Sequence, residues 1–308
     1  MIFFKFILKR LVQVVIVIFC VILLAFVLIR LAPGNPARML LPDDATDQQV
    51  AAMEARLGLD QPVTTQFYKY LAGVFTGDLG TSITYKVPVI DIISRRLPAT
   101  LKLTAATVLV SLLISIPMGI IAGAKQGSVI DFAAMLFALL GQSMSPVWLS
   151  VLNIYVFAVI LQWLPALGYG GIKYLILPAV TLGYPLASQV TRFGRSGMID
   201  VMKEDYIIAT MAKGIPASRI YTKYAFKNAL IPIVTVIGIQ IGTFLGGAVV
   251  VETVFSWSGI GQLMFQAVGN RDYPMVQSLL LISAVIFAMI NFFVDVINSF
   301  IDPRITLE

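Results

Sequence analysis

Six long apolar runs constrain the fold of this chain more than any other feature of its sequence. A helix that crosses a membrane needs about 20 consecutive apolar residues. Runs near or above that length stand at residues 11–31, 99–122, 132–161, 174–190, 229–251 and 279–301. Charged residues make up 12% of the chain, which is about half the fraction found in a soluble domain. We therefore expect an all-α polytopic membrane protein with six transmembrane helices.

Three of these runs differ from a plain membrane span. The first follows a basic N-terminal segment, as in a signal peptide, but it is too long and lacks a small-residue cleavage site, so we expect it to remain as a span. The third is long enough to be tilted, or broken near Pro146, because proline disrupts the helical hydrogen-bond ladder. The fourth is the weakest, since Pro178 and Pro185 interrupt it.

The distribution of lysine and arginine predicts the orientation of the chain in the membrane. Cytoplasmic loops of membrane proteins carry an excess of these residues. One set of short segments holds Lys5, Lys9, Arg10, Lys125, Arg192, Arg195, Lys203, Lys213, Arg219, Lys223, Lys227 and Arg304. The opposite short loops hold only Lys173 and Arg271. Both termini are therefore expected in the cytoplasm, and orientation and membrane lipids account for the net charge of +6 without nucleic acid.

The apolar runs divide the chain into four parts. Residues 1–32 form an N-terminal segment and the first span, and 33–98 form a small extracytoplasmic helical domain. Residues 99–301 form a five-helix core that includes a basic loop at 192–232, and 302–308 form a cytoplasmic tail.

Local signals predict three helices in the extracytoplasmic domain. Thr46 and Gln49 have the spacing of a capping box, and Gly58 is expected to end the helix that this box begins. A second helix is expected to end near Gly77, and residues 89–97 suggest a third, amphipathic helix at the membrane surface. The domain is either a structural cap or a contact surface for an external partner.

Two apolar runs carry stripes of small residues at four-residue spacing, which places them on one helix face. The stripe in the second run is Thr107, Ser111, Ser115, Gly119 and Gly123, and that in the fifth is Gly238, Gly242 and Gly246. Small residues allow helices to approach closely in lipid. The stripes indicate either packing within the bundle or a flat wall along a passage.

Polar residues within the apolar runs are candidates for a wet translocation path, because polar groups in lipid are costly. Together with two stripe glycines they are Gln142, Ser143, Ser145, Gln240, Gly242, Gly246, Asn291 and Asp295. Asp295 belongs to a polar face with Asn298 and Asp302, and it has a structural alternative, which is to pair with a basic residue. Glu252, at the outer end of the fifth run, either gates the path or caps a helix, and an interfacial aromatic belt explains Phe255 and Trp257.

The chain lacks the residues for chemistry of its own. It has no histidine, which removes the commonest general base and the commonest transition-metal ligand, and no metal site is expected. It has no phosphate-binding loop of the form Gly-x-x-x-x-Gly-Lys-Ser/Thr. The single cysteine, Cys20, excludes a disulfide within the chain. A transporter built from this chain would take its energy from another protein.

The sequence of the basic loop is typical of a segment that a partner protein binds. Its part at 204–232 predicts a short helix that Gly214 ends in a left-handed conformation, followed by a second helix to residue 230. Ala209, Ala212 and Gly214 present a surface with little side-chain bulk. The alternative is a basic helix resting on anionic headgroups, which explains the charges but not the small surface.

At these residues the chain resembles the permease subunits of ATP-binding-cassette importers, and most of all the B-type subunits of the dipeptide/oligopeptide/nickel family. The loop is similar to that family's coupling loop at Asp205-Tyr206, Ala209-Thr210, Ala212-Lys213-Gly214 and Asn228-Ala229-Leu230-Ile231-Pro232. Ile208 stands where the general pattern has Glu. Further similar pieces run through the chain, among them 77–82, 96–100, 252–261 and 270–274.

The resemblance implies a binding-protein-dependent importer of di- or oligopeptides in the inner membrane. It implies a second, homologous permease, two cytoplasmic subunits that bind ATP and magnesium, and an extracytoplasmic substrate-binding protein. The coupling residues would be Asp205, Ala209, Ala212, Lys213 and Gly214, and the outer gate or binding-protein contacts Glu252, Trp257, Arg271 and Asp272. Nickel, a metal chelate or glutathione are alternative substrates. A standalone secondary transporter and an intramembrane enzyme are the competing classes.

Overall fold

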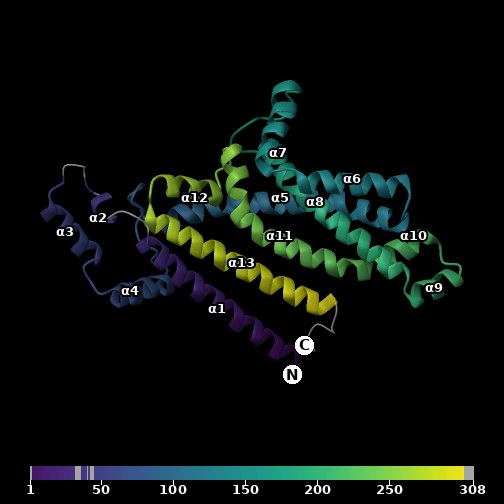
Figure 1. Ribbon diagram of the computed structural model, residues 1–308, viewed down its shortest axis with the longest axis horizontal. Helices are drawn as coiled ribbons and strands as arrows, with labels where there is room; N and C mark the ends of the chain where they lie inside the picture. The colour runs from purple at the N-terminus through teal and green to yellow at the C-terminus, as the bar shows by residue number, and fades with distance from the viewer. Residues whose placement is uncertain (1, 32–35, 40, 42–44, 302–308) are drawn as a thin grey trace.

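The computed structural model describes residues 2–31, 36–39, 41 and 45–301. Figure 1 shows a bundle of long helices with shorter helices at its two ends. The helices are α1 (Ile2–Leu31), α2 (Pro36–Met39), α3 (Asp47–Leu57), α4 (Val63–Thr76), α5 (Val89–Ala124), α6 (Val129–Ser143), α7 (Pro146–Asn153), the π-helix η1 (Ile154–Ile160), α8 (Ile172–Met202), α9 (Asp205–Ala212), α10 (Ala217–Arg219), the π-helix η2 (Ile220–Ala225), α11 (Phe226–Val254), α12 (Ile260–Gly269) and α13 (Tyr273–Ile301). The described residues contain no β-strand beyond one isolated bridge, so the predicted all-α class is confirmed.

The length and composition of the helices agree with a protein that crosses a membrane several times. Among the described residues, three helices are long and apolar enough to span it, at Phe6–Val27, Val89–Ala124 and Tyr273–Ser299. The third apolar run is broken before Pro146, where α6 and the helix formed by α7 and η1 meet at 106°. This pair counts as a fourth span if it is taken as one. The number of six spans stays a prediction.

The core of the bundle is the packing of α5 against α8, with α6 and α11 at their sides. The stripe from Thr107 to Gly123 is buried and lies along this seam. A Cβ added at Gly119 would lie 3.3 Å from the carbonyl oxygen of Thr191, and one added at Gly123 would lie 3.0 Å from that of Arg195. This stripe therefore serves close packing.

The second stripe of small residues lies on α11. A Cβ added at Gly238 would overlap Val294 of α13, so this glycine also serves packing. Gly242 and Gly246 lie in α11, but their surroundings fall outside the described residues.

Two expected helix boundaries are wrong, both at prolines. The separate surface helix expected at 89–97 is the beginning of α5, which continues through Pro98, so the predicted domain boundary lies inside a helix. Val89 and Ile93 are buried against residues of α12 and α13, and this packing offsets the hydrogen bond that Pro98 loses. The loop helix expected to end before Pro232 instead continues through it in α11.

The short helices of the extracytoplasmic segment end where the local signals predict. Thr46 and Gln49 form the capping box of α3, and Gly58 ends that helix with φ 69°. Gly77 ends α4 with φ 79°. The ring of Phe67 on α4 packs on Phe26 of α1, with 5.0 Å between ring centroids. The segment is thus attached to the first long helix. The expected cytoplasmic tail, 302–308, with Asp302 and Arg304, lies outside the described residues.

The α5–α8 seam gives a first prediction. Gly123→Val places two methyl groups where Met198 and a backbone carbonyl already lie, and overpacking of this kind costs about 1–3 kcal/mol. The thermal unfolding temperature of the protein in detergent should fall. Gly269→Val is the matched control, because a Cβ at Gly269 meets nothing within 4 Å. Equal unfolding temperatures for the two variants would contradict the close packing of α5 against α8 at Gly123.

Candidate functional site

The connection between α8 and α11 presents α9 to solvent while one residue anchors it. Ile207 is fully buried in a cluster with Met198 of α8, with Ile220 and Ala225 of η2, and with Ala229 of α11. The predicted coupling residues Asp205, Ala209, Ala212, Lys213 and Gly214 are all exposed. Gly214 has φ 73°, the left-handed conformation that its sequence context predicts. The small-residue turn therefore lies on the surface.

The exposed surface of α9 is more apolar than the small residues alone suggest. Tyr206, Ile208 and Met211 are 40%, 55% and 44% exposed. Ile208, at the position where the general family pattern has Glu, is the most exposed of the three. Our sequence reasoning missed this contribution, although Ile208 and Met211 have the three-residue spacing of one helix face. Exposed apolar clusters of this kind mark contacts with other proteins or with a membrane.

At the opposite end of the bundle, Glu252 joins three helices. Its side chain is completely buried. The hydroxyl of Thr100 on α5 donates to one carboxylate oxygen over 2.7 Å, and the backbone N–H of Gln262 on α12 donates to the other over 3.0 Å. The Thr100 hydroxyl also accepts from the N–H of Ile260, at 2.9 Å. The carboxylate thus satisfies the first turn of α12, where a negative charge is favoured. Any side chain at Gly259 would overlap it.

Trp257 is also internal. It is 2% exposed, and its indole N–H donates to the carbonyl oxygen of Ala99 over 3.0 Å. Tyr169 meets it edge to face, with 4.8 Å between ring centroids. Phe255 is likewise 2% exposed. The expected aromatic belt at these two positions is therefore wrong, because both rings are covered by the chain itself.

Asp272 fastens the extracytoplasmic segment to the bundle. Its carboxylate accepts from the Ser82 hydroxyl over 2.5 Å and from the N–H groups of Ile83 and Thr84 over 3.2 and 3.1 Å. It also accepts from the N–H of Met275 in the first turn of α13, at 3.3 Å. Asp272 is 1% exposed.

Of the four outer gate or contact candidates, only Arg271 is exposed. The structure buries Glu252, Trp257 and Asp272 as connections between helices. Their role as gate or partner contacts stays a prediction.

The predicted path residues lie on three parts of the bundle, which are the break between α6 and α7, helix α11 and helix α13. Gln142, Ser143 and Ser145 lie where α6 breaks before α7, and all three are exposed. Gln142 accepts a hydrogen bond from Arg192 of α8, and Ser143 donates to the carbonyl of Leu139 over 2.8 Å.

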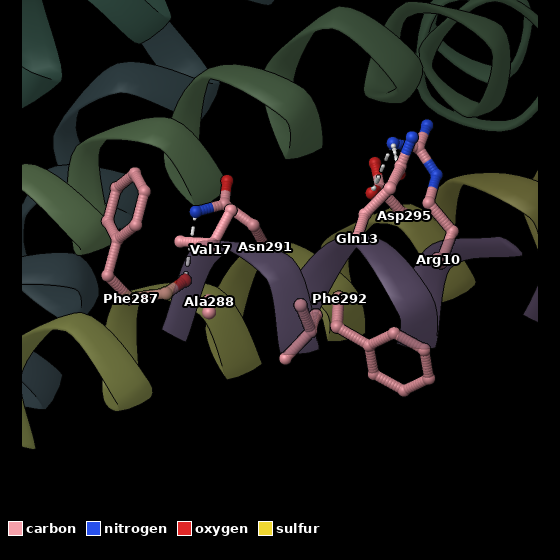
Figure 2. A pocket seen from close by; sticks show the side chains of 9 residues that line it. Arg10, Gln13, Val17, Phe287, Ala288, Asn291, Phe292 and Asp295 are labelled. Atoms are coloured by element: carbon pink, nitrogen blue, oxygen red, sulfur yellow. Dashed lines mark hydrogen bonds and ion pairs between the residues drawn. The ribbon is translucent and has the colours of Figure 1, made fainter. Parts of the chain in front are cut away.

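Gln240 lies on α11 and donates to Gln189 of α8 over 2.7 Å. Asn291 and Asp295 lie instead on α13, in a groove that faces α1, as Figure 2 shows. Asp295 pairs with Arg10 at 3.2 Å, so the alternative of a basic partner is confirmed.

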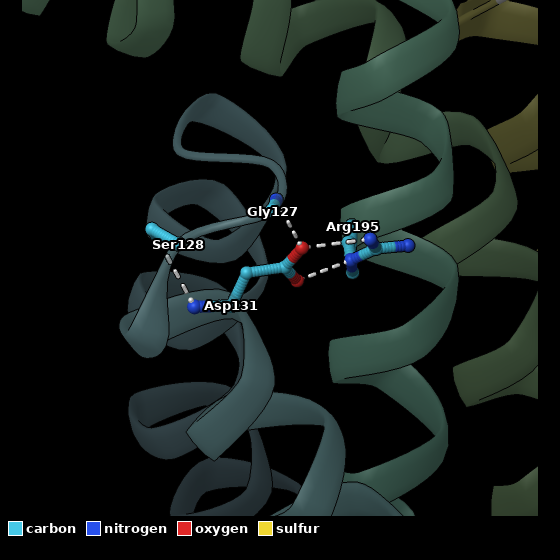
Figure 3. A network of polar contacts seen from close by, with 4 residues as sticks. All are labelled: Gly127, Ser128, Asp131 and Arg195. Carbon is cyan, nitrogen blue, oxygen red and sulfur yellow. Dashed lines mark hydrogen bonds and ion pairs between the residues drawn. The ribbon is translucent and has the colours of Figure 1, made fainter.

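An ion pair that our sequence reasoning missed joins α6 to α8. Figure 3 shows the buried Asp131 facing Arg195, whose Nη2 donates to the carboxylate over 2.8 Å. The same carboxylate accepts from the N–H of Gly127 over 2.9 Å, and the Ser128 hydroxyl caps α6 by accepting from the Asp131 N–H. The Ser128–Asp131 spacing predicts the cap, but the partner lies 64 residues away.

The Glu252 contacts give a second prediction. Glu252→Ala leaves the Thr100 hydroxyl and the Gln262 N–H without their acceptor, and each unsatisfied buried group costs about 1–3 kcal/mol. The unfolding temperature, followed by the fluorescence of the nearby buried Trp257, should drop, and Glu252→Gln, which keeps one acceptor oxygen, should drop less. An alanine variant as stable as the unchanged protein would contradict this account of Glu252.

Comparison with known proteins identifies the family. The family model described as "Binding-protein-dependent transport system inner membrane component" matches residues 115–307. The model for the N-terminal part of such membrane components matches residues 3–104.

Similar proteins extend over nearly the whole chain. The dipeptide transport system permease protein DppB of Alkalihalophilus pseudofirmus is 39% identical, over 96% of this chain and 98% of its own length. The glutathione transport system permease protein GsiC of Salmonella paratyphi A is 38% identical, over 98% of both chains. A probable peptide ABC transporter permease of Sinorhizobium fredii is also 38% identical, over 97% of this chain and 98% of its own.

Among solved structures, an inward-facing conformation of the MetNI methionine ABC transporter shares the fold. Its TM-score is 0.58 at 21% identity, over 69% of this chain and 97% of the other. Because two family models cover most of the sequence and relatives above 30% identity align end to end, this chain belongs to the binding-protein-dependent transport system inner membrane components, the multi-pass inner-membrane permeases of ABC importers that work with an ATPase and a substrate-binding protein.

Proposed function

We propose that this chain imports di- and oligopeptides. Two relatives that align over nearly their whole length are named as dipeptide and peptide permeases, at 39% and 38% identity. A glutathione permease matches at 38%, and glutathione is itself a small peptide, so it is the first alternative. Nickel and metal chelates are more distant alternatives.

The observation that carries the mechanism is the exposed apolar face of α9, held to the bundle by Ile207. A groove on an ATPase subunit that covers Tyr206, Ile208 and Met211 would bury apolar surface, and the small side chains of Ala209 and Ala212 would allow close approach. Since Ile207 packs on residues of both α8 and the start of α11, a displacement of α9 would move both helices. ATP and magnesium would be bound by the partner, and this chain would supply the lever.

The break between α6 and α7 supports a second permease on that side. Met144 and Ser145 have extended backbone, and Gln142 and Ser145 are exposed. Backbone that is not helical does not face lipid, and at membrane depth it is covered by protein or lines a water-filled cavity. Trp148, in the first turn of α7, is 53% exposed, and α7 stands out from the bundle in Figure 1. A homologous permease there would complete the path, with one ATPase for each permease.

The layout of the helices supports the expected orientation. In Figure 1, α2, α3 and α4 lie at the opposite end of the long helices from α9, from the beginning of α1 and from the end of α13. If α9 meets the ATPase, both termini are cytoplasmic and residues 33–98 face the substrate-binding protein. Arg271, the exposed candidate beside the buried Asp272, is the residue we expect to contact it.

The α9 lever gives a third prediction. Ala209→Asp puts a charge into the proposed contact, whereas Ala217→Asp makes the same change on α10, outside the contact, and both alanines are exposed. In proteoliposomes that hold the assembled transporter, Ala209→Asp should lower ATP-driven uptake at least about tenfold, since an unpaired charge buried in an interface costs more than 1.4 kcal/mol. Ala217→Asp should transport normally. Normal uptake by both variants would refute the lever.

The identity of the complex gives a fourth prediction. The tagged chain, purified in mild detergent, should carry a sister permease, ATPase subunits and a binding protein loaded with peptide. Vesicles with the complex should take up a labelled dipeptide only with ATP. Uptake by the chain alone under a proton gradient would establish a secondary transporter instead. If glutathione competes with the labelled substrate and dipeptides do not, glutathione is the transported substrate.

A further inference from the structure

The groove between α1 and α13 contains polar groups that lie apart from the α9 lever. It has a volume of about 200 Å³ (Figure 2). Val14 and Val17 of α1 and Phe287 and Ala288 of α13 form apolar walls, and Arg10 and Asp295 lie at its charged end. It therefore combines a surface for hydrocarbon with two opposite charges.

The groove opens at the edge of the bundle. Helix α1 packs along α13, and its other faces are apolar and exposed, with Leu11 at 47%, Val15 at 60% and Ile16 at 54%. Both helices are long and apolar enough to span a membrane. In a bilayer, such a face meets acyl chains, so lipid has direct access to the groove.

Within the part of the chain that the structure describes, the ion pair in the groove uses only part of its hydrogen-bonding capacity. Arg10 Nη1 lies 3.2 Å from the Asp295 carboxylate and also donates to Gln13 over 3.2 Å. A guanidinium has five N–H donors and a carboxylate about four acceptor positions. The side chains of Arg10 and Asp295 remain 36% and 30% exposed. Ionised groups within a membrane helix are costly unless they are well satisfied.

We propose that this groove binds a zwitterionic phospholipid whose headgroup carries a primary ammonium. Its phosphate accepts from Arg10, its ammonium donates to Asp295, and the first acyl carbons lie between Val14, Val17 and Phe287. The lipid headgroup carries one negative and one positive charge. Each of them would lie against the oppositely charged side chain of the ion pair. The proposal requires only that α1 and α13 lie in a membrane, so it stands apart from the identity of the transported substrate.

Headgroup chemistry separates this site from general contact with the bilayer. Phosphatidylethanolamine has the ammonium N–H donors that Asp295 accepts. Phosphatidylcholine has the same charges but no N–H donor, and phosphatidylglycerol has no cation. With identical acyl chains, the three lipids differ only at the charged end of the groove.

The test is native mass spectrometry of the full chain in detergent, titrated with these three lipids. Phosphatidylethanolamine should bind at least about tenfold more tightly than the other two, as expected for charge-assisted hydrogen bonds. Arg10→Gln and Asp295→Asn should each weaken it about tenfold. Lys9→Gln removes an exposed charge next to Arg10 but outside the groove, and should leave binding unchanged.

A second pair of variants keeps the charges of Arg10 and Asp295. The test therefore does not depend on whether the charge-removing variants fold. Val17→Trp fills the groove from an exposed position, whereas Val15→Trp makes the same change on α1 outside it. Only Val17→Trp should displace phosphatidylethanolamine. Equal binding of the three lipids, equal loss in Lys9→Gln and Arg10→Gln, or full binding by Val17→Trp would each overturn the proposal. Displacement of bound lipid by a dipeptide would instead assign the groove to the substrate.

Discussion

The rest of the bundle depends on the close approach of α5 and α8 around Gly194. A Cβ added at Gly194 would lie 3.7 Å from the Cα of Gly119 on α5 and 3.4 Å from Ile233 on α11. Three helices therefore meet at Gly194, and the contact of α5 with α8 is tighter still at Gly119 and Gly123. In a membrane the hydrophobic effect does not drive helices together, and packing of this kind takes its place. Arg195, the next residue of α8, then holds α6 at the same level through its ion pair with Asp131.

Different contacts connect the helices at the two ends of the α5–α8 seam. At one end the buried carboxylates of Glu252 and Asp272 join α5, α11, α12 and α13 and hold the loop at 82–84. At the other end Ile207 attaches α9 to α8 and to the beginning of α11. A permease that is driven by a soluble ATPase needs both features. An exposed helix has to contact the ATPase, and closely packed helices have to move with it. In this chain only a few charged side chains take part in these connections.

Sequence-based reasoning succeeded where a local rule decides the structure. The capping box at Thr46 and Gln49, the left-handed Gly214 and the break before Pro146 depend on neighbours along the chain. It failed where tertiary packing outweighs a local preference, as when α5 continues through Pro98 because Val89 and Ile93 are buried. It also could not pair groups distant in sequence, such as Thr100 with Glu252 or Arg10 with Asp295, so residues expected along one path lie on separate parts of the bundle.

The central claim is that α9 is where the energy of ATP enters this chain, and a photocrosslink tests it most directly. A photoreactive amino acid at Ile208, the most exposed apolar residue of α9, would be activated in membranes that hold the assembled transporter. The account predicts a covalent product with the ATPase subunit, whose yield changes when ATP is added, and no such product from the same probe at Phe265 on α12. A probe at Ile208 that labels only lipid would contradict it.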